Sequence, residues 1–237
     1  MDSQVELPSH NQWLLSDAPT LRSGAPQSQP LEGMKDSAQD WRERHQRDVA
    51  DSLDFFSSAQ KVEREKWVVN RLLSCCAIQF DESDLEPARE PADIQFREAR
   101  FQVKELMDTG RRRCDEFKTK LRQIEEADSE SDLLEPYAPK TISLSEVAQL
   151  VVEKSEALAV EKYGPKERQT LDLVFYFNYL DFGVEPPLEF SCRSIGFRSL
   201  SVVTNTYCAV LATAPGAPSF LSVGVYLDGQ QVLPNAV

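Results

Sequence analysis

The alternation of apolar and polar residues predicts helices in four parts of the chain. Residues 59–76, AQKVEREKWVVNRLLSCC, carry an apolar stripe at helical spacing with charged residues opposite it. Residues 143–163 predict the clearest helix, because Ser143 and Glu146 form a capping box at its start and a Gly-Pro pair ends it. A polar, mixed-charge helix is predicted within residues 109–131, and another within residues 37–60.

Other segments have the alternation and composition of β-strands. The strongest signal is a hairpin, DIQF followed by RFQVKELM, joined by the short connection REA. Further strands are predicted at 77–80, at 171–182 and at 198–213, the last with a turn at Thr204-Asn205 and with a turn and short helix after it. The order is helix, strand, strand, strand, helix, helix, strand, strand. It predicts an α/β fold with a small mixed sheet flanked by helices.

Composition separates a tail from the domain. Residues 1–50 are rich in Ser, Gln, Pro, Asp and Glu, with isolated apolar residues, and are expected to be mostly disordered. The folded domain is expected to span residues 51–225, and residues 226–237 are expected to form a C-terminal tail. No apolar run approaches the ~18 residues of a membrane span, and no secretory signal opens the chain. These features predict a cytoplasmic protein without a membrane segment.

Charge and residue usage exclude several kinds of site. The two histidines, His10 and His45, both lie in the polar N-terminal region, which nearly excludes a core zinc site or a His-based triad. The five cysteines are irregularly spaced and predict reduced structural thiols. The formal net charge of -13 argues against a broad nucleic-acid-binding coat. It still allows a local basic groove, because fields are screened within about 8–10 Å.

The predicted hairpin brings three polar side chains to one face. Side chains alternate along a strand, so Asp93, Gln102 and Lys104 share a face opposite the apolar residues. Carboxylate and amide oxygens suit a hard cation such as Mg²⁺ or Mn²⁺, which would activate water next to a phosphodiester, with Lys104 stabilising the developing charge. The alternative for Asp93 is a strand-entry residue, and for Lys104 a side chain that snorkels from an edge strand.

These residues resemble the motif of the PD-(D/E)XK nuclease superfamily, with Pro91-x-Asp93 as its first half and Gln102-Val103-Lys104 as its second. The segments EREKWV and RSLS, together with the hairpin, also make the chain similar to a small bacterial family labelled as endonucleases of unknown function. The superfamily resemblance implies an α-β-β-β-α-β core, dependence on Mg²⁺ and cleavage of DNA. Many members act as dimers, so a homodimer is one assembly to expect. Gln102 departs from the usual acid, a change that also occurs in enzymes attacking methylated DNA.

The resemblance adds further candidate residues. Superfamily members often carry a Glu on the first helix, followed by apolar residues at fixed offsets, and Glu65 fits that spacing. It implies Glu65 as a further metal ligand. A basic run and a basic strand start are candidate DNA phosphate contacts: Arg111, Arg112, Arg113 and Arg198. The alternatives are a solvated helix face for the run and a structural role for Arg198.

Three functions remain open from the sequence. The leading prediction is a metal-dependent endonuclease acting on DNA. The second is a catalytically inactive module of the same fold that binds nucleic acid or protein, because an amide replaces an acid at Gln102. The third is an acidic scaffold that binds protein partners through its tail and polar helices.

Overall fold

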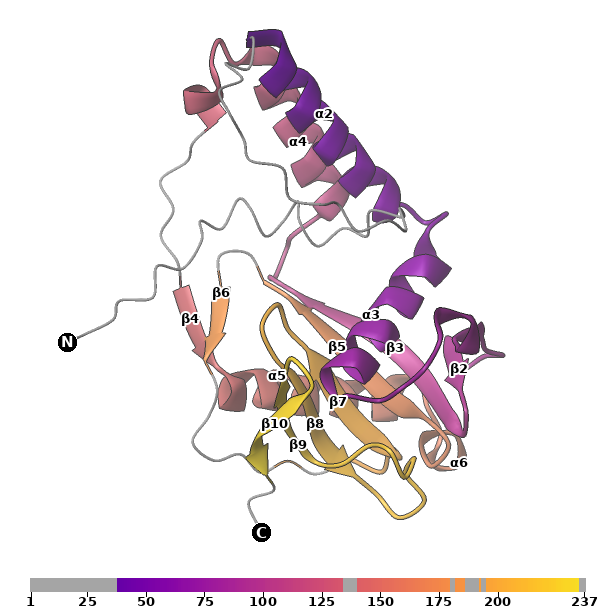
Figure 1. Cartoon of the computed structure of the whole chain (residues 1–237). Helices are drawn as coiled ribbons and strands as arrows, with labels where there is room; N and C mark the ends of the chain where they lie inside the picture. The colour runs from indigo at the N-terminus through magenta and orange to yellow at the C-terminus, as the bar shows by residue number, and fades with distance from the viewer. Residues whose placement is uncertain (1–37, 134–139, 180–181, 186–191, 193–194, 235–237) are drawn as a thin grey trace, which may run out of the picture. The chain divides into compact units, whose positions relative to one another are not determined.

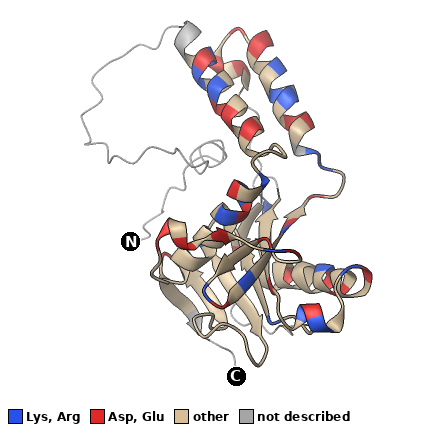
Figure 2. Cartoon of the chain, turned by 90° about the vertical axis from the view of Figure 1, so that its right-hand side faces the viewer, with Lys and Arg blue, Asp and Glu red and all other residues tan. Residues whose placement is uncertain are grey.

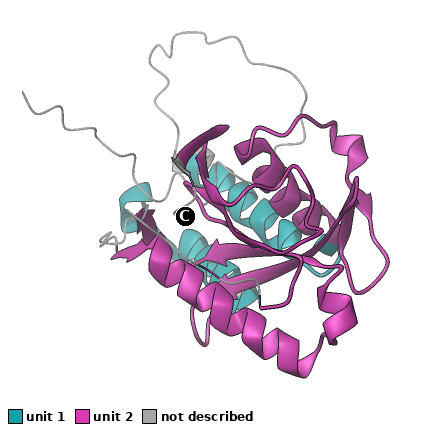
Figure 3. Cartoon of the chain, turned by 90° about the horizontal axis from the view of Figure 1, so that it is seen from below, with its two compact units in different colours: residues 1–61, 112–138 teal, residues 62–111, 139–237 magenta. Residues whose placement is uncertain are grey.

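The computed structural model describes residues 38–133, 140–179, 182–185, 192 and 195–234. The chain divides into two compact units, coloured separately in Figure 3. Unit 1 comprises residues 1–61 and 112–138, and unit 2 comprises residues 62–111 and 139–237. The expected single domain of residues 51–225 is therefore divided between two units. None of the helices in the described ranges is long and apolar enough to cross a membrane.

Unit 1 is built on two helices, α2 (Ala38–Phe55) and α4 (Arg113–Glu126), with a short 3-10 helix η3 (Glu130–Leu133) after them (Figure 1). The helices correspond to those predicted within 37–60 and 109–131. A small core joins all three elements: Trp41, Val49, Ile124, Ala127 and Leu133. Figure 2 shows acidic and basic residues interspersed along both helices. Each helix thus buries its apolar stripe against the other and leaves a mixed-charge surface.

Unit 2 contains an eight-stranded mixed sheet in the order β1-β2-β3-β5-β7-β8-β9-β10. Its strands are β1 (Glu86–Pro87), β2 (Ile94–Phe96), β3 (Ala99–Met107), β5 (Asp172–Asn178), β7 (Ser199–Val203), β8 (Cys208–Thr213), β9 (Gly224–Leu227) and β10 (Gln230–Pro234). β5 runs parallel to both β3 and β7, and the other neighbouring strands are antiparallel. β4 (Lys140–Ser143) and β6 (Phe182–Glu185) form a separate parallel pair.

Helices cover both faces of the large sheet, so the predicted α/β class with a mixed, helix-flanked sheet is confirmed at that level (Figure 1). α3 (Lys61–Cys75) packs its Val68, Val69, Leu72 and Leu73 on what we call the α3 face. α5 (Leu144–Glu161) packs on the opposite, α5 face. The short helix α6 (Pro165–Arg168) then leads into β5.

Alternation along β3 decides which layer each side chain enters. Phe101 and Val103 pack in the core of the α3 face, whereas Leu106 packs in the core of the α5 face. Since successive residues of a strand point to opposite sides, Gln102 and Lys104 share the α5 face with Leu106. This placement determines which residues can meet at the candidate site.

The capping box predicted for α5 is present. The Glu146 amide donates to the Ser143 hydroxyl at 3.2 Å, and the Ser143 amide donates to the Glu146 carboxylate at 2.8 Å. These bonds satisfy two amides that the first turn of a helix leaves without backbone partners. The Ser143 hydroxyl also donates to the Glu146 carboxylate at 2.7 Å, and this bond, followed by that from the Ser143 amide, lowers the pKa of Glu146 below its usual range.

Three segments differ from the expected structure. Residues 77–80 form no strand, because Ala77 takes a positive φ of 57° at the end of α3 and the chain leaves as a turn. Residues 214–221 form turns without a helix. Residues 226–237, expected as a tail, include the end of β9 and all of β10, which extend the sheet by antiparallel pairing. Part of the expected N-terminal tail lies in α2, and residues 1–37 lie outside the described residues.

Candidate functional site

Asp93 immediately precedes β2 and is held there by its own backbone. Its amide donates to the Phe101 carbonyl at 2.8 Å, and its carbonyl accepts from the Ala88 amide at 2.8 Å. Its carboxylate oxygen Oδ2 accepts from the Val103 amide at 2.9 Å and from the side-chain amide of Gln102. The hairpin register, Ile94 opposite Phe101, sets this arrangement because it carries Asp93 to the level of Gln102.

Gln102 links Asp93 to a tyrosine that the sequence did not indicate. Gln102 is only 3% exposed, and its Oε1 accepts from the Tyr163 hydroxyl at 2.7 Å. Burial raises the pKa of Tyr163 above its usual value, so the phenol stays protonated at neutral pH. Tyr163 follows α5 and packs edge-on against Phe197. A hydrogen-bonded series therefore runs from Tyr163 through Gln102 to Asp93.

Lys104 is the third predicted member of the site. It is half-buried on the α5 face and lies level with Phe175 of the neighbouring strand β5. Asp93 and Gln102 are joined directly, and Lys104 follows Gln102 by two residues on the same face of β3. The arrangement combines one anion, one amide and one cation over a short stretch of the hairpin.

Glu65 occupies a different layer. It belongs to the buried side of α3, at 9% exposure, in line with Val68, Val69 and Leu72. α3 packs on the α3 face, whereas Gln102 and Lys104 point to the α5 face. The sequence spacing located Glu65 correctly on its helix, but the sheet lies between that helix and the face of Gln102 and Lys104.

The oxygen donors at the hairpin allow a limited test of the predicted metal site. Mg²⁺ is commonly bound by one or two carboxylates, with water and substrate phosphate completing its shell. Asp93 supplies one carboxylate, and Gln102 supplies one amide oxygen. Within the described ranges, no group of three or more His, Cys, Asp or Glu is arranged to hold a metal ion. The donor set therefore fits Mg²⁺ or Mn²⁺ held partly by substrate, and does not fit a closed site made by protein alone.

Arg111 takes part in a second polar network, at the carboxyl ends of β3 and β5. Its guanidinium donates to the Asn178 carbonyl at 2.6 Å and lies 3.9 Å from the Asp108 carboxylate. Asn178 in turn donates to Glu105 at 2.8 Å. The Arg111 side chain is only 6% exposed. Its hydrogen bonds join the strand ends, so the expected phosphate contact would require the guanidinium to leave these partners.

Arg198 is bound to a buried acid. Asp172 is fully buried at the start of β5, and its carboxylate accepts from the Arg198 guanidinium, from the Ser199 hydroxyl at 2.8 Å and from the Arg100 amide at 2.9 Å. These four residues tie together the amino ends of β3, β5 and β7. The structural alternative for Arg198 thus has direct partners in the fold, and its expected DNA contact stays a prediction.

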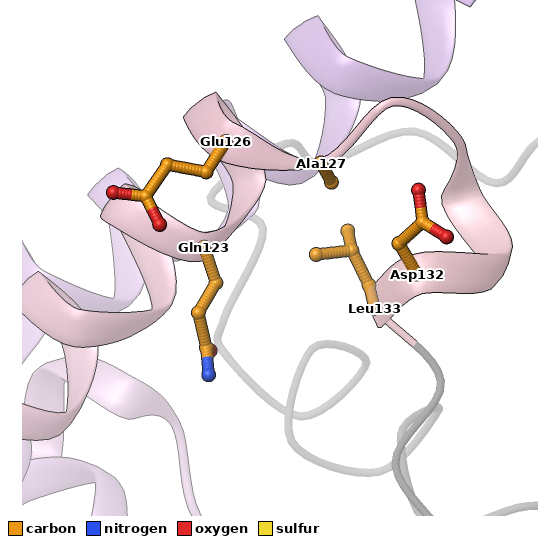
Figure 4. A pocket seen from close by; sticks show the side chains of 5 residues that line it. All are labelled: Gln123, Glu126, Ala127, Asp132 and Leu133. Carbon is orange, nitrogen blue, oxygen red and sulfur yellow. The ribbon is translucent and has the colours of Figure 1, made fainter.

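The other two candidate arginines, Arg112 and Arg113, belong to unit 1. Arg112 is exposed just before α4, and the Arg113 side chain lies outside the described part of the structure. Unit 1 also contains a shallow pocket, whose lining side chains are shown in Figure 4: Gln123, Glu126, Ala127, Asp132 and Leu133. The pocket holds two acids and no cation. It lacks the cation of the hairpin site, and we assign it no role.

Comparison with known proteins now adds a family. A family model described as "Putative endonuclease, protein of unknown function (DUF1780)" matches residues 37–226. The chain belongs to this family. The match spans α2, α4 and the sheet as far as Tyr226 in β9, so it includes the whole hairpin site. A nuclease function is consistent with the family's description, which names neither a metal nor a superfamily.

A solved structure shares the fold at low sequence identity. It is described as a protein of unknown function of the monooxygenase superfamily, from Pseudomonas aeruginosa strain PAO1. The two chains are 23% identical, with a TM-score of 0.51, and the likeness covers 81% of this chain and 98% of the other. At this identity the likeness concerns the α/β fold alone. No curated protein matches the chain.

Proposed function

We propose that this protein is a metal-dependent endonuclease that hydrolyses DNA phosphodiester bonds, with Asp93, Gln102 and Lys104 at its site. The observation that carries the proposal is the carboxylate of Asp93 held against Gln102 and the Val103 amide, with Lys104 on the same face. The family description supports a nuclease. The metal, the DNA substrate and the residue roles belong to the proposal.

The order of elements supports a PD-(D/E)XK-like core for the proposed enzyme. α3 is followed by β1, β2 and β3, and then by α5 and β5, which matches the α-β-β-β-α-β order. Other elements interrupt the series: α4 and η3 of unit 1 and then β4 lie between β3 and α5, and α6 lies between α5 and β5. β2 and β3 are antiparallel, and β5 joins β3 in parallel. In this proposal, Asp93 lies at the start of β2 and the second half of the motif lies within β3.

Asp93 and Gln102 would hold Mg²⁺ or Mn²⁺. When bound, the cation lowers the pKa of a coordinated water and neutralises charge on the phosphodiester. Gln102 now directs its NH₂ group to Asp93 and its Oε1 to Tyr163. A turn of the amide by 180° would direct Oε1 toward the cation. Because a tyrosine hydroxyl both donates and accepts, Tyr163 would keep its hydrogen bond to Gln102 after that turn.

Lys104 and Tyr163 would both contribute from the positions that they hold in the structure. The Lys104 ammonium would donate to non-bridging phosphate oxygens, where negative charge grows as the bond breaks. Tyr163 is a positioning residue, because it acts through the amide of Gln102. Glu65 is left out of this proposed site, since it lies in the layer on the α3 face.

A second function, a catalytically inactive module that binds nucleic acid or protein, is favoured by the same hydrogen bonds. Two donors already bind Asp93 Oδ2, and Gln102 is satisfied at both ends of its amide. A closed network of this kind stabilises the hairpin without any cation. The two functions differ in whether Asp93 exchanges the amide of Gln102 for a metal ion.

Cleavage of supercoiled plasmid and single-stranded DNA in Mg²⁺ or Mn²⁺ distinguishes these functions. The variants are Asp93→Asn and Lys104→Met, with Lys118→Met in unit 1 as the matched control for loss of a lysine. The endonuclease predicts cleavage by the wild type and the control, and strong loss in both site variants. The inactive module predicts equal, background cleavage by all four proteins, with DNA binding measured by fluorescence anisotropy surviving Lys104→Met.

A further inference from the structure

Two cysteines that are distant in sequence meet beneath the α3 face. Cys75, at the end of α3, is 5% exposed, and Cys208, at the start of β8, is fully buried. The Cys75 thiol donates to the Tyr226 carbonyl at 3.2 Å, and Tyr226 lies directly opposite Cys208 in the β8–β9 pair. The Cys208 thiol reaches the Arg71 carbonyl, one helical turn before Cys75, at 3.6 Å. The Cys208 thiol therefore lies against the helix that carries Cys75, and the Cys75 thiol lies against Tyr226, the residue of β9 that pairs with Cys208.

The two sulfurs are in unlike electrostatic states. A hydrogen bond from the Cys208 thiol lowers the pKa of Cys75 to about 7, although burial opposes this shift. The same hydrogen bond and burial raise the pKa of Cys208 well above its usual value. Burial raises the pKa of the neighbouring Cys76 to about 12. When Cys75 loses its proton, it becomes a thiolate next to a protonated thiol, which is the combination found in reactive dithiols because the thiolate is the nucleophile.

We propose that Cys75 and Cys208 form an oxidisable dithiol that closes to an intramolecular disulfide on reaction with a small peroxide. The Cys75 thiolate attacks hydrogen peroxide, forms an S–O bond, and releases hydroxide as the O–O bond breaks. The Cys208 sulfur then attacks the sulfenic acid at Cys75, and its proton leaves with the hydroxyl as water. In sum, two thiols are oxidised by two electrons and one peroxide is reduced to two waters.

The position of the pair gives the disulfide a structural consequence. It would link the last turn of α3 to β8 and close a long segment of chain that contains the hairpin and α5. A cross-link that closes a long loop restricts the unfolded chain and so raises the melting temperature. The proposal concerns a site distinct from Asp93 and does not depend on the nuclease function.

The test is to treat the full chain with hydrogen peroxide, block remaining thiols, and map disulfides by mass spectrometry. No trypsin site separates Cys75 from Cys76, so Cys76→Ser and Cys75→Ser identify the reacting sulfur. The expected result is one Cys75–Cys208 cross-link in the wild type and in Cys76→Ser, and none in Cys75→Ser. The cross-link should raise the melting temperature, and dithiothreitol should restore the original value.

The dependence of the reaction on pH is a second readout that a merely buried pair would not show. The oxidation rate should rise through about pH 7, the pKa of Cys75. The proposal is overturned if Cys75 is over-oxidised or unreacted while Cys208 remains a thiol. A cross-link through Cys76, or a rate that rises only near pH 9, overturns it as well. The mapping on wild type and Cys76→Ser decides the outcome even if Cys75→Ser does not fold.

Discussion

Replacing Gln102 with Glu would put a second carboxylate against Asp93. Gln102 is 3% exposed, so water would screen the new charge poorly. Two carboxylates about 4 Å apart repel by roughly 4 kcal/mol at an effective dielectric constant of about 20. Protonating one of them at pH 7 would cost about the same. We therefore expect Gln102→Glu to lower the free energy of unfolding by about 4 kcal/mol at pH 7.

The repulsion between the two carboxylates determines how the stability of Gln102→Glu changes with pH. The introduced carboxyl would have a folded pKa above its unfolded value of about 4.3, so its cost is absent below pH 4 and grows as pH rises. Mg²⁺ between the two carboxylates would remove much of the repulsion. If the side-chain oxygens of residues 93 and 102 converge on one cation, Mg²⁺ should stabilise Gln102→Glu more than the wild type.

Urea unfolding at pH 4 and pH 7, with and without Mg²⁺, measures both effects. Gln95→Glu is the control, because it adds a charge at the one half-exposed position of β2 in the same hairpin and should change stability little. If Gln102→Glu is as stable as the wild type at pH 7, the contact between Gln102 and Asp93 is refuted. If Mg²⁺ fails to restore the lost stability, the proposal that the oxygens of residues 93 and 102 converge on one cation is refuted.

Three further predictions concern other parts of the fold. Asp172→Asn should lose about 3–5 kcal/mol of unfolding free energy in urea denaturation, because it leaves the nearly buried Arg198 guanidinium without its carboxylate partner; a loss under 1 kcal/mol would contradict the ion pair. Ser143→Ala should lose about 1 kcal/mol by removing the cap of α5, and an unchanged urea midpoint would count against the cap. Burial raises the pKa of Tyr226 to about 12, so its stabilising effect is complete below pH 10 and falls as pH rises toward 12. The wild type should therefore lose about 1 kcal/mol more stability than Tyr226→Phe between pH 9 and pH 11, measured by thermal unfolding, and parallel losses would refute this.

Local sequence signals predicted the helices and the hairpin because their causes are local. The capping residues Ser143 and Glu146 act within one turn of α5, and alternation from Phe101 to Leu106 assigns the faces of β3. The same alternation correctly grouped Gln102 and Lys104. The hairpin register then determined the contact between Gln102 and Asp93.

Features that depend on packing between distant segments could not be predicted. Nothing in the local sequence shows that Tyr163, after α5, reaches Gln102, or that Arg198 finds Asp172. The helical spacing of Glu65 was read correctly, but only the fold shows which face of the sheet its helix covers. The pairing of α2 with α4 joins segments on either side of the hairpin, so residues 51–225 did not form one unit.

The rate of plasmid nicking by wild type relative to Asp93→Asn, in Mn²⁺ and at equal protein concentration, tests the central claim most directly. Asp93 is the one carboxylate of the proposed site, and loss of even an outer partner of a metal commonly costs 10–100-fold in activity. The proposed endonuclease predicts metal-dependent nicking by the wild type and a rate at least about 100-fold lower in Asp93→Asn. Equal rates in the two proteins, or rates unaffected by EDTA, would contradict it.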